Sequence, residues 1–281
     1  MRDLRVARLR HPANTHRRAR MQLDLTDKVI QVAAASQGLG YAIAEQAAAE
    51  GARLCICSRD PDAIDAAAQR IRDRGAEVMA TALDVRDGAA VAAWTEACIE
   101  RFGRLDGLVV NAGGPPAGGF DEFEDADWQA AFELNLLSAV RLIRAARPAL
   151  ARSQGAVLTI TSSAAREPID ALLLSNVMRS GVVALVKSLS RTLGSEGIRV
   201  NNLIPGTIET DRLRALHGQM AQAMGTSVEA VQERVCAQIP LGRLGQADEF
   251  ARAAVFLLSP IAGYISGANL QIDGGALRGL W

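Results

Sequence analysis

The sequence is poor in the residue types that build metal sites and disulfide frameworks. Its three histidines, His11, His16 and His217, are scattered and form no ligand cluster. The four cysteines include no C-x-x-C pair, which favours free thiols in a reducing compartment, the cytoplasm, over disulfides or a metal site. We therefore expect no metal cofactor.

Long apolar runs and net charge are also missing. The longest apolar region, residues 171–189, is broken by Asn176, Arg179 and Lys187, so we expect no membrane span. The 31 lysines and arginines balance 31 aspartates and glutamates, which argues against a general nucleic-acid binder. With 281 residues, 49% of them hydrophobic, the chain has enough core for one large α/β domain.

The first twenty residues differ in composition from the rest. They hold seven arginines and one acid, Asp3, and no apolar run of the kind that marks a secretory signal. Pro12 and the absence of serine argue against a transit peptide, and Met21 stands directly before the first regular pattern. We expect residues 1–20 to be a disordered extension, or an upstream start assigned in error, before a single domain over residues 21–281.

The chain is organised around residues 29–44. An apolar run, residues 29–33, predicts a buried strand, and an alanine-rich helix opens near Gly38 after a turn of small residues. Unpaired N–H groups at a helix N-terminus attract an anion, and glycine lets the backbone approach it. The spacing is small-x-x-x-Gly-x-Gly, with Ala34 first and Gly40 last. Small residues also serve plain helix–strand packing, so this turn alone is a weak indication of phosphate binding.

Strands and helices alternate along the chain, which predicts right-handed crossovers and a doubly wound parallel sheet of the Rossmann type, with helices on both faces. Further strands are expected at residues 54–57, 78–83, 107–110, 156–160, 198–204 and 270–272. Helices are expected at residues 41–50, 60–74, 88–102, 128–151 with an interruption near Ala131, 174–193 and 248–258. Residues 207–239 read as a helical insertion. Ligands bind at the carboxyl ends of such strands.

These landmarks together resemble the classical short-chain dehydrogenases/reductases across residues 23–275. The family's glycine turn matches at Gly38 and Gly40, and its Asn-Ala-Gly motif at residues 111–113. Its Pro-Gly matches at residues 205–206 and its closing Asp-Gly-Gly at residues 273–275. The resemblance is to the 3-oxoacyl-[acyl-carrier-protein] reductase-like branch. It implies hydride transfer between NAD(P) and a carbonyl or alcohol substrate, which the sequence does not name.

The family's catalytic groups are an asparagine that holds a proton-relay water, a serine, a tyrosine and a lysine. The resemblance puts Asn135 and Ser162 in the first two places. It puts Ser175 at the tyrosine position and Arg179 at the lysine position. A tyrosine hydroxyl titrates near pH 10, whereas an aliphatic serine hydroxyl is a far weaker acid. Loss of a general acid typically lowers the rate roughly 10²–10⁴-fold.

No other residue replaces the tyrosine and the lysine easily. The only tyrosines are Tyr41, on the first helix, and Tyr264, near the last strand. The only lysines are Lys28, at the base of the first strand, and Lys187, two turns beyond Arg179. Arg179 supplies a fixed charge and several donors, so we expect it to hold ribose hydroxyls or an anionic group.

The resemblance also implies a cofactor site along the carboxyl edge of the sheet. At the end of the second strand, Ser58 stands where NAD sites carry an acid, and Arg59 suits a 2′-phosphate. We therefore expect NADP(H) rather than NAD(H), an exposed arginine at a strand end being the alternative. Replacement of the first family glycine by Ala34 is mild if the local φ is negative. The expected cofactor-binding residues are Ala34, Ser36, Gln37, Gly38, Leu39, Gly40, Ser58, Arg59, Asp84, Val85, Asn111, Ala112, Gly113, Arg179, Pro205, Gly206 and Ile208.

Three functions stay open from the sequence. The first is an oxidoreductase with an altered proton path, and the second is a nucleotide-binding protein of the same fold that acts by binding or assembly. The third is a serine hydrolase with Ser36 as nucleophile, for which only His217 is available as the base. Arg166 follows the strand predicted at residues 156–160. It either binds an anionic substrate or is an exposed loop residue without a role.

The family usually forms dimers or tetramers through two long helices. Here these helices, residues 135–150 and 174–193, and their flanks carry more apolar positions than one core face needs. We therefore expect a homotetramer, with a dimer as the second choice. The apolar positions are Leu137, Val140, Leu142, Leu173, Val183, Leu185 and Leu189.

Overall fold

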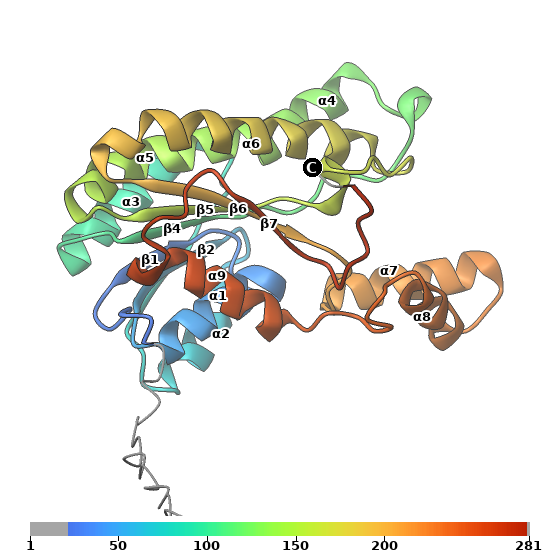
Figure 1. The fold of residues 1–281 in the computed structure, drawn as a ribbon, viewed down its shortest axis with the longest axis horizontal. Coiled ribbons are helices and arrows are strands. Elements are labelled where there is room, and N and C mark those ends of the chain that lie inside the picture. The colour runs from blue at the N-terminus through green and yellow to red at the C-terminus, as the bar shows by residue number, and fades with distance from the viewer. Residues whose placement is uncertain (1–21, 280–281) are drawn as a thin grey trace, which may run out of the picture.

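A seven-stranded parallel sheet forms the centre of the molecule (Figure 1). The computed structural model describes residues 22–279. The strands lie in the order β3-β2-β1-β4-β5-β6-β7. Their bounds are β1 Val29–Val32, β2 Arg53–Ser58, β3 Val78–Ala82, β4 Gly107–Val110, β5 Ala156–Ile160, β6 Arg199–Pro205 and β7 Asn269–Ile272. The predicted Rossmann-type sheet is confirmed, and its order reverses between β1 and β4, where ligands bind in such folds.

Helices cover both faces of this sheet (Figure 1). One face is covered by α1 Gly38–Ala49, α2 Pro61–Arg72 and α9 Ala247–Leu258. The other is covered by α3 Gly88–Phe102, α5 Ser138–Ser153 and α6 Leu173–Thr192. Each layer of helices closes its own apolar core against the strands. Since both faces are covered, every residue of β1 and β4 is buried, and all of them except Gln31 are apolar or glycine.

The long helical pattern predicted for residues 128–151 is interrupted by a wide turn. The chain forms α4 Asp125–Phe132, a π-helical turn at Glu133–Leu137, and then α5. The interruption therefore lies just after the predicted position, Ala131. A π turn inserts one residue into the helical ladder and often lies at a functional site. Here the inserted turn contains Asn135, which is buried.

The predicted insertion is a pair of helices, α7 Asp211–Met224 and α8 Val228–Ala237. We call residues 207–245 the α7–α8 arm. Its two ends are joined by backbone bonds, from Glu209 N to Gly245 O at 2.8 Å and from Gly245 N to Thr207 O at 3.1 Å. Figure 1 shows both helices standing to one side of the sheet, beyond the carboxyl ends of the strands. The arm therefore projects from a closed base at the edge where ligands bind.

The predicted disordered extension, residues 1–20, lies outside the described residues. Within residues 22–279, no helix combines the length and the apolar character that crossing a membrane requires. The same part of the chain contains no group of three or more histidine, cysteine or acidic side chains placed to hold a metal ion.

Candidate active site

The turn after β1 leaves the N-terminus of α1 open to an anion. Gln37, the residue before the helix, makes no side-chain cap, and the first turn holds no acidic residue. By contrast, α2 and α3 begin at Asp60 and Asp87, whose carboxylates accept from first-turn N–H groups. Since the first N–H groups of a helix have no partner within it, those of α1 are left for a ligand. This is the arrangement that a phosphate requires.

Gly40 is required by the close packing of this turn. A Cβ at Gly40 would lie 2.4 Å from the carbonyl oxygen of Ala34 and 2.8 Å from Nδ2 of Asn111. Asn111 Nδ2 donates to that same carbonyl at 3.2 Å, which ties the turn after β1 to the loop after β4. The predicted cofactor residues of these two loops therefore lie together at the reversal point of the sheet.

Ala34 replaces the first glycine of the family's turn, and we expect this replacement to be mild only where the local φ is negative. In the structure the φ of Ala34 is not negative. Its φ is +51°, in the left-handed region, where a Cβ is disfavoured. We expected little effect if φ were negative, and the sequence offered no sign that it is positive. The turn keeps the conformation that glycine adopts freely, at a cost of about 1 kcal/mol in backbone strain.

The adenosine end of the expected site lies beyond β2 and β3. Ser58 Oγ donates to the carbonyl of Asp60 at 3.1 Å, and Arg59 is exposed without an ion pair among the described residues. Asp84 is held by Arg86, whose hydrogen bonds keep the pKa of the Asp84 carboxyl below its usual range. Arg59 is thus a cation without an ion-pair partner in the described chain, and its role toward a 2′-phosphate stays a prediction.

Arg179 joins the loop after β4 to the end of β5. It is only 7% exposed, and Nη1 donates to the carbonyl of Ile160 at 3.0 Å. Nη2 donates to the carbonyls of Ala112 at 3.2 Å and Gly113 at 3.4 Å. These donors were expected to serve ribose or an anion, but they are given to the chain's own backbone. Arg179 is therefore first of all a clamp that positions the Asn-Ala-Gly loop.

Asn135 reaches the same loop from the π turn. Its Nδ2 donates to the carbonyl of Gly113 at 2.6 Å, so Gly113 accepts from both Asn135 and Arg179. The Oδ1 atom of Asn135 is buried and has no hydrogen-bond partner among residues 22–279. A buried acceptor that the chain leaves unpaired fits an ordered water or a substrate hydroxyl. The water-holding role of Asn135 stays a prediction, for which this unpaired acceptor leaves room.

The two candidate serines border this cluster. Ser162 follows β5 and caps the short helix Ser163–Ala165, accepting from Ala164 N at 3.2 Å. Its own hydroxyl hydrogen has no acceptor in the described chain, so it is free to bond a substrate oxygen. Ser175 lies one turn before Arg179 on α6 and is 8% exposed. Its Oγ bonds to nothing within residues 22–279, yet it is not among the fully buried unpaired atoms.

The loop after β6 completes the edge of the site. Gly206 passes close to the closing Asp-Gly-Gly, because a Cβ there would lie 2.6 Å from Cα of Asp273. The side chain of Ile208 is buried and packs against Gly245. The buried side chain of Ile208 is therefore taken up by packing against the base of the arm.

Two residues of the α7–α8 arm were missed in the sequence. Thr210 caps α7 by accepting from Leu213 N, and its methyl lies 3.9 Å from where a Cβ of Gly38 would be. The guanidinium of Arg212 lies over Gly114, with Nη2 2.7 Å from where a Cβ of Gly114 would be. A threonine directly before a helical pattern is a capping signal that could have revealed Thr210. Nothing local to the sequence places Arg212 beside Gly114.

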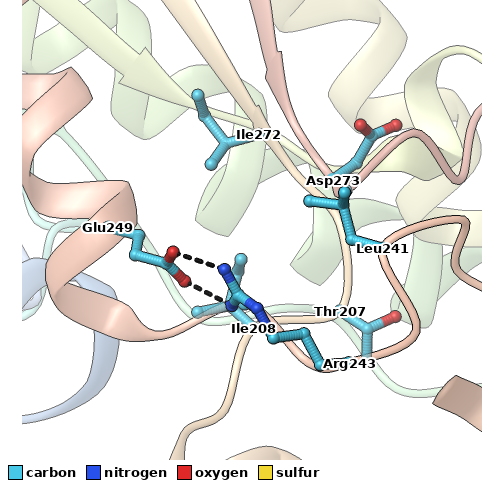
Figure 2. Close-up of a pocket in the computed structure, with 9 residues that line it drawn as sticks. Thr207, Ile208, Leu241, Arg243, Glu249, Ile272 and Asp273 are labelled. Atoms are coloured by element: carbon cyan, nitrogen blue, oxygen red, sulfur yellow. Dashed lines mark hydrogen bonds and ion pairs between the residues drawn. The ribbon is translucent and has the colours of Figure 1, made fainter.

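A cavity of about 100 Å³ lies at the base of the arm, where Figure 2 shows the Arg243–Glu249 ion pair along its wall. It is lined by Thr207, Ile208, Leu241, Arg243, Gly245, Glu249, Ile272, Asp273 and Gly274. None of the four candidate catalytic residues lines it, although Ile208, one of the expected cofactor-binding residues, does. A larger cavity, of about 400 Å³, lies at the amino ends of the strands, against Lys28, Asp106 and Arg199.

Asn135, Ser162, Ser175 and Arg179 share no helix, strand or loop with the described tyrosines, the histidine or Ser36. Tyr41 donates to Glu45 on α1, and Tyr264 is fully exposed beside β7. His217, the only histidine of residues 22–279, is buried on α7. Ser36 stands in the turn before α1, and its carbonyl accepts from Arg70. No tyrosine of the described chain reaches the Asn135–Arg179 cluster through a hydrogen bond.

The sequence and the fold place the chain in a known family. The family profile described as Enoyl-(Acyl carrier protein) reductase matches residues 33–276. A relative, the 3-oxoacyl-[acyl-carrier-protein] reductase FabG of Escherichia coli K12, is 34% identical over 254 residues, covering 90% of this chain and 98% of that protein. The chain belongs to the short-chain dehydrogenase/reductase family.

Solved structures of the same family are closely similar. L-Sorbose reductase from Gluconobacter frateurii, complexed with NADPH and L-sorbose, matches with a TM-score of 0.89 and 31% identity, over 92% of this chain and all of that one. A short-chain oxidoreductase from Pseudomonas aeruginosa PAO1, NADPH-bound and described as containing an atypical catalytic center, matches with a TM-score of 0.83 and 32% identity. The match to the Pseudomonas aeruginosa structure covers 91% of this chain and 99% of that one.

Proposed function

We propose that the protein is an NADP(H)-dependent oxidoreductase that acts on a carbonyl or alcohol through an altered catalytic group, with Ser175 and Arg179 in place of tyrosine and lysine. The observation that carries the proposal is the meeting of Asn135 and Arg179 on one acceptor, the carbonyl of Gly113. This contact holds the loop, the relay asparagine and the residue at the lysine position in one place. Relatives named as reductases and NADPH-bound neighbours support it.

The cofactor would be held along the carboxyl edge of the sheet. The open N-terminus of α1 suits the pyrophosphate, and Thr210 closes over it from the arm. Arg59 suits the 2′-phosphate of NADP(H). When bound, NADP(H) supplies or accepts the hydride. The residues of this chain then have to bind the substrate, hold its oxygen and deliver a proton.

Four side chains divide that work. Ser162 donates its free hydroxyl hydrogen to the carbonyl oxygen of the substrate. Asn135 Oδ1 holds a water in the relay, and Ser175 passes a proton from that water to the reacting oxygen. The charge of Arg179 stabilises negative charge that develops on this oxygen, because the buried site screens it little. Burial and the nearby Arg212 lower the pKa of Arg179 to about 10, so it stays charged at neutral pH.

The test is a cofactor and substrate panel. Purified protein is titrated with NADPH and NADH by nicotinamide fluorescence, and the loss of NADPH is then followed with a panel of aldehydes, ketones and keto acids. We expect NADPH to bind more tightly than NADH and at least one carbonyl to be reduced. The variants Asn135→Ala and Ser162→Ala should lower kcat while the NADPH Kd stays within about twofold.

A second function is supported by a specific observation. The donors of Arg179 are committed to backbone carbonyls, and Ser175 is a poor acid, so the site resembles a nucleotide-binding site more than a complete proton path. The alternative is a catalytically impaired protein that acts by binding or assembly. Tight NADPH binding without turnover across the whole panel would favour it. The buried free thiols, Cys55, Cys57 and Cys98, agree with a reducing compartment, and we propose a cytoplasmic location.

A further inference from the structure

Two arginines face the same short loop in the candidate active site. Arg179 bonds to the carbonyls of Ala112 and Gly113 from within the core. Arg212 comes from the first turn of α7 and lies over Gly114, the next residue of the loop. The two side chains are close enough for Arg212 to lower the pKa of Arg179. Two neighbouring guanidinium charges repel each other, and an anion bound between or beside them would reduce that repulsion.

The described chain supplies no such anion. Neither Arg179 nor Arg212 forms an ion pair within residues 22–279. The two carboxylates at the start of α7, Glu209 and Asp211, are both taken by Arg214, at 3.1 and 2.6 Å. Two exposed arginines of the same helical turn thus differ: Arg214 is neutralised locally, whereas Arg212 points its charge at the active-site loop.

The loop is shaped to receive this guanidinium. A Cβ at Gly114 would lie 2.7 Å from Nη2 and 2.9 Å from Nη1 of Arg212. Any side chain at position 114 would therefore displace the guanidinium, whereas the backbone of Gly114 itself has no positive φ that needs glycine. The absence of a side chain at this position keeps the charge of Arg212 beside the loop to which Arg179 donates.

We infer that Arg212 is a specificity-determining residue that binds a carboxylate or phosphate carried by the substrate next to its reacting carbonyl. The inference rests on the proposed function and adds a substrate class to it, the oxo acids. The neighbouring Gly113 carbonyl is held by Asn135 and Arg179, so an anion bound by Arg212 would lie beside the loop that these two candidate catalytic residues hold. Arg166 follows Ser162, and its buried Nε lacks a partner among the described residues, which adds a further unused donor at this edge.

The experiment compares Arg212→Gln with Arg214→Gln, its matched control on the same helical turn. The probes are two acid and ester pairs, phenylglyoxylate with its methyl ester and acetoacetate with its ethyl ester, at fixed salt and pH. We expect the wild type to prefer the acid of at least one pair by about tenfold or more in kcat/KM. Arg212→Gln should lower kcat/KM for that acid by roughly tenfold to a hundredfold, the value of a charged hydrogen bond, and leave the ester within about twofold. Arg214→Gln should change neither.

A displacement variant tests position as well as charge. Gly114→Ala keeps every charge but moves the guanidinium of Arg212, so it should lower the acid preference as Arg212→Gln does. The NADPH Kd, measured by fluorescence, should stay within about twofold in Arg212→Gln. If NADPH affinity falls instead, with acid and ester affected equally, the charge serves the cofactor phosphates and the inference is overturned.

A binding measurement separates this inference from the proposed function. Calorimetry with phenylglyoxylate and acetoacetate on the NADP⁺-saturated protein needs no turnover. Binding of either acid that is lost in Arg212→Gln and kept in Arg214→Gln would support the anion site even if no carbonyl is reduced. Reduction of the esters alone, with no Arg212-dependent binding of either acid, would support the oxidoreductase and overturn the anion site.

Discussion

Arg179 donates to the carbonyl oxygen of Ile160 at 3.0 Å, across the gap between α6 and the end of β5. Its other terminal nitrogen donates to Ala112 and Gly113 beyond β4. One buried cation therefore connects two neighbouring strand ends and fixes the loop between Asn111 and Gly114. The resemblance puts Arg179 at the position of the family's lysine. A flat guanidinium with several donors can bridge acceptors that one ammonium cannot reach together.

Removal of this clamp should destabilise the protein as well as weaken the cofactor site. Arg179→Ala removes the Arg179 donors from the carbonyls of Ile160 and Ala112, whereas Gly113 still accepts from Asn135. We therefore expect unfolding in urea to require about 2 kcal/mol less free energy. NADPH affinity should fall by roughly 1.5–3 kcal/mol, because the loop that shapes the site loosens. Arg191→Ala, an exposed arginine near the end of the same helix, is the control and should change neither quantity. If the urea midpoint of Arg179→Ala equals that of the wild type, Arg179 does not hold the loop as argued.

Ala34 offers a stabilising substitution. Its φ of +51° costs an L-residue energy that glycine avoids, so Ala34→Gly should raise the free energy of unfolding by about 1 kcal/mol. NADPH binding should be unchanged or tighter, since glycine is what the family carries there. Ala33→Gly is the matched control. Ala33 is fully buried without a positive φ, so its replacement should destabilise the protein. Equal destabilisation by both changes would argue against strain at Ala34.

Arg59 should decide the choice of cofactor. Arg59→Asp replaces a cation with an anion at the end of β2, so the 2′-phosphate of NADPH is repelled and the ribose hydroxyls of NADH gain an acceptor. We expect the preference between the two cofactors to reverse in fluorescence titrations. Arg152→Asp, the same change on the exposed end of α5 at the opposite edge of the sheet, should have no effect. Equal affinity of the wild type for NADPH and NADH would remove the argument.

The fold was predictable because its signals are local and repeated. Apolar strand runs, helix caps such as Asp60 and the glycine turn each depend on a few neighbouring residues, and their order specifies the sheet. The positive φ of Ala34 and the bonds of Arg179 depend on residues distant in sequence, so no local pattern revealed them. Arg212 was missed for the same reason, since only the fold of the arm carries it to Gly114.

Assembly through α5 and α6 remains a prediction, and the structure identifies an exposed apolar residue with which to test it. Leu142, one of the seven apolar positions expected at the interface, is 1% exposed and belongs to the core. Val177, on α6 but not one of those seven, is 48% exposed. We expect light scattering at micromolar concentration to give a tetramer, or a dimer, and Val177→Asp to lower the mass. Leu216→Asp, on the arm and 47% exposed, should leave the mass unchanged. A monomeric wild type would rule the assembly out.

The proton path can be tested by single changes at Ser175. If Ser175 only fills space, Ser175→Ala should leave turnover unchanged. If it relays a proton from a water held by Asn135, the same change should lower kcat while the NADPH Kd stays within about twofold. The Oγ of Ser175 is unpaired in the described chain and not fully buried, which suits a relay. Steady-state rates and fluorescence titrations separate these outcomes.

Restoring the family pair tests the rest of the site. In Ser175→Tyr with Arg179→Lys, the phenol acquires an acidity that a serine lacks, and the ammonium lowers its pKa further. We expect the double variant to gain or raise carbonyl reductase activity, because Asn135 and Ser162 remain in place with an unpaired Oδ1 and a free hydroxyl hydrogen. Arg179→Lys alone is the control for the lost clamp and should not raise activity. If the double variant binds NADPH normally but reduces no carbonyl of the panel, Asn135 and Ser162 are not arranged for hydride transfer. A binding role then explains the site better, since an intact cofactor site without a working proton path serves recognition and not turnover.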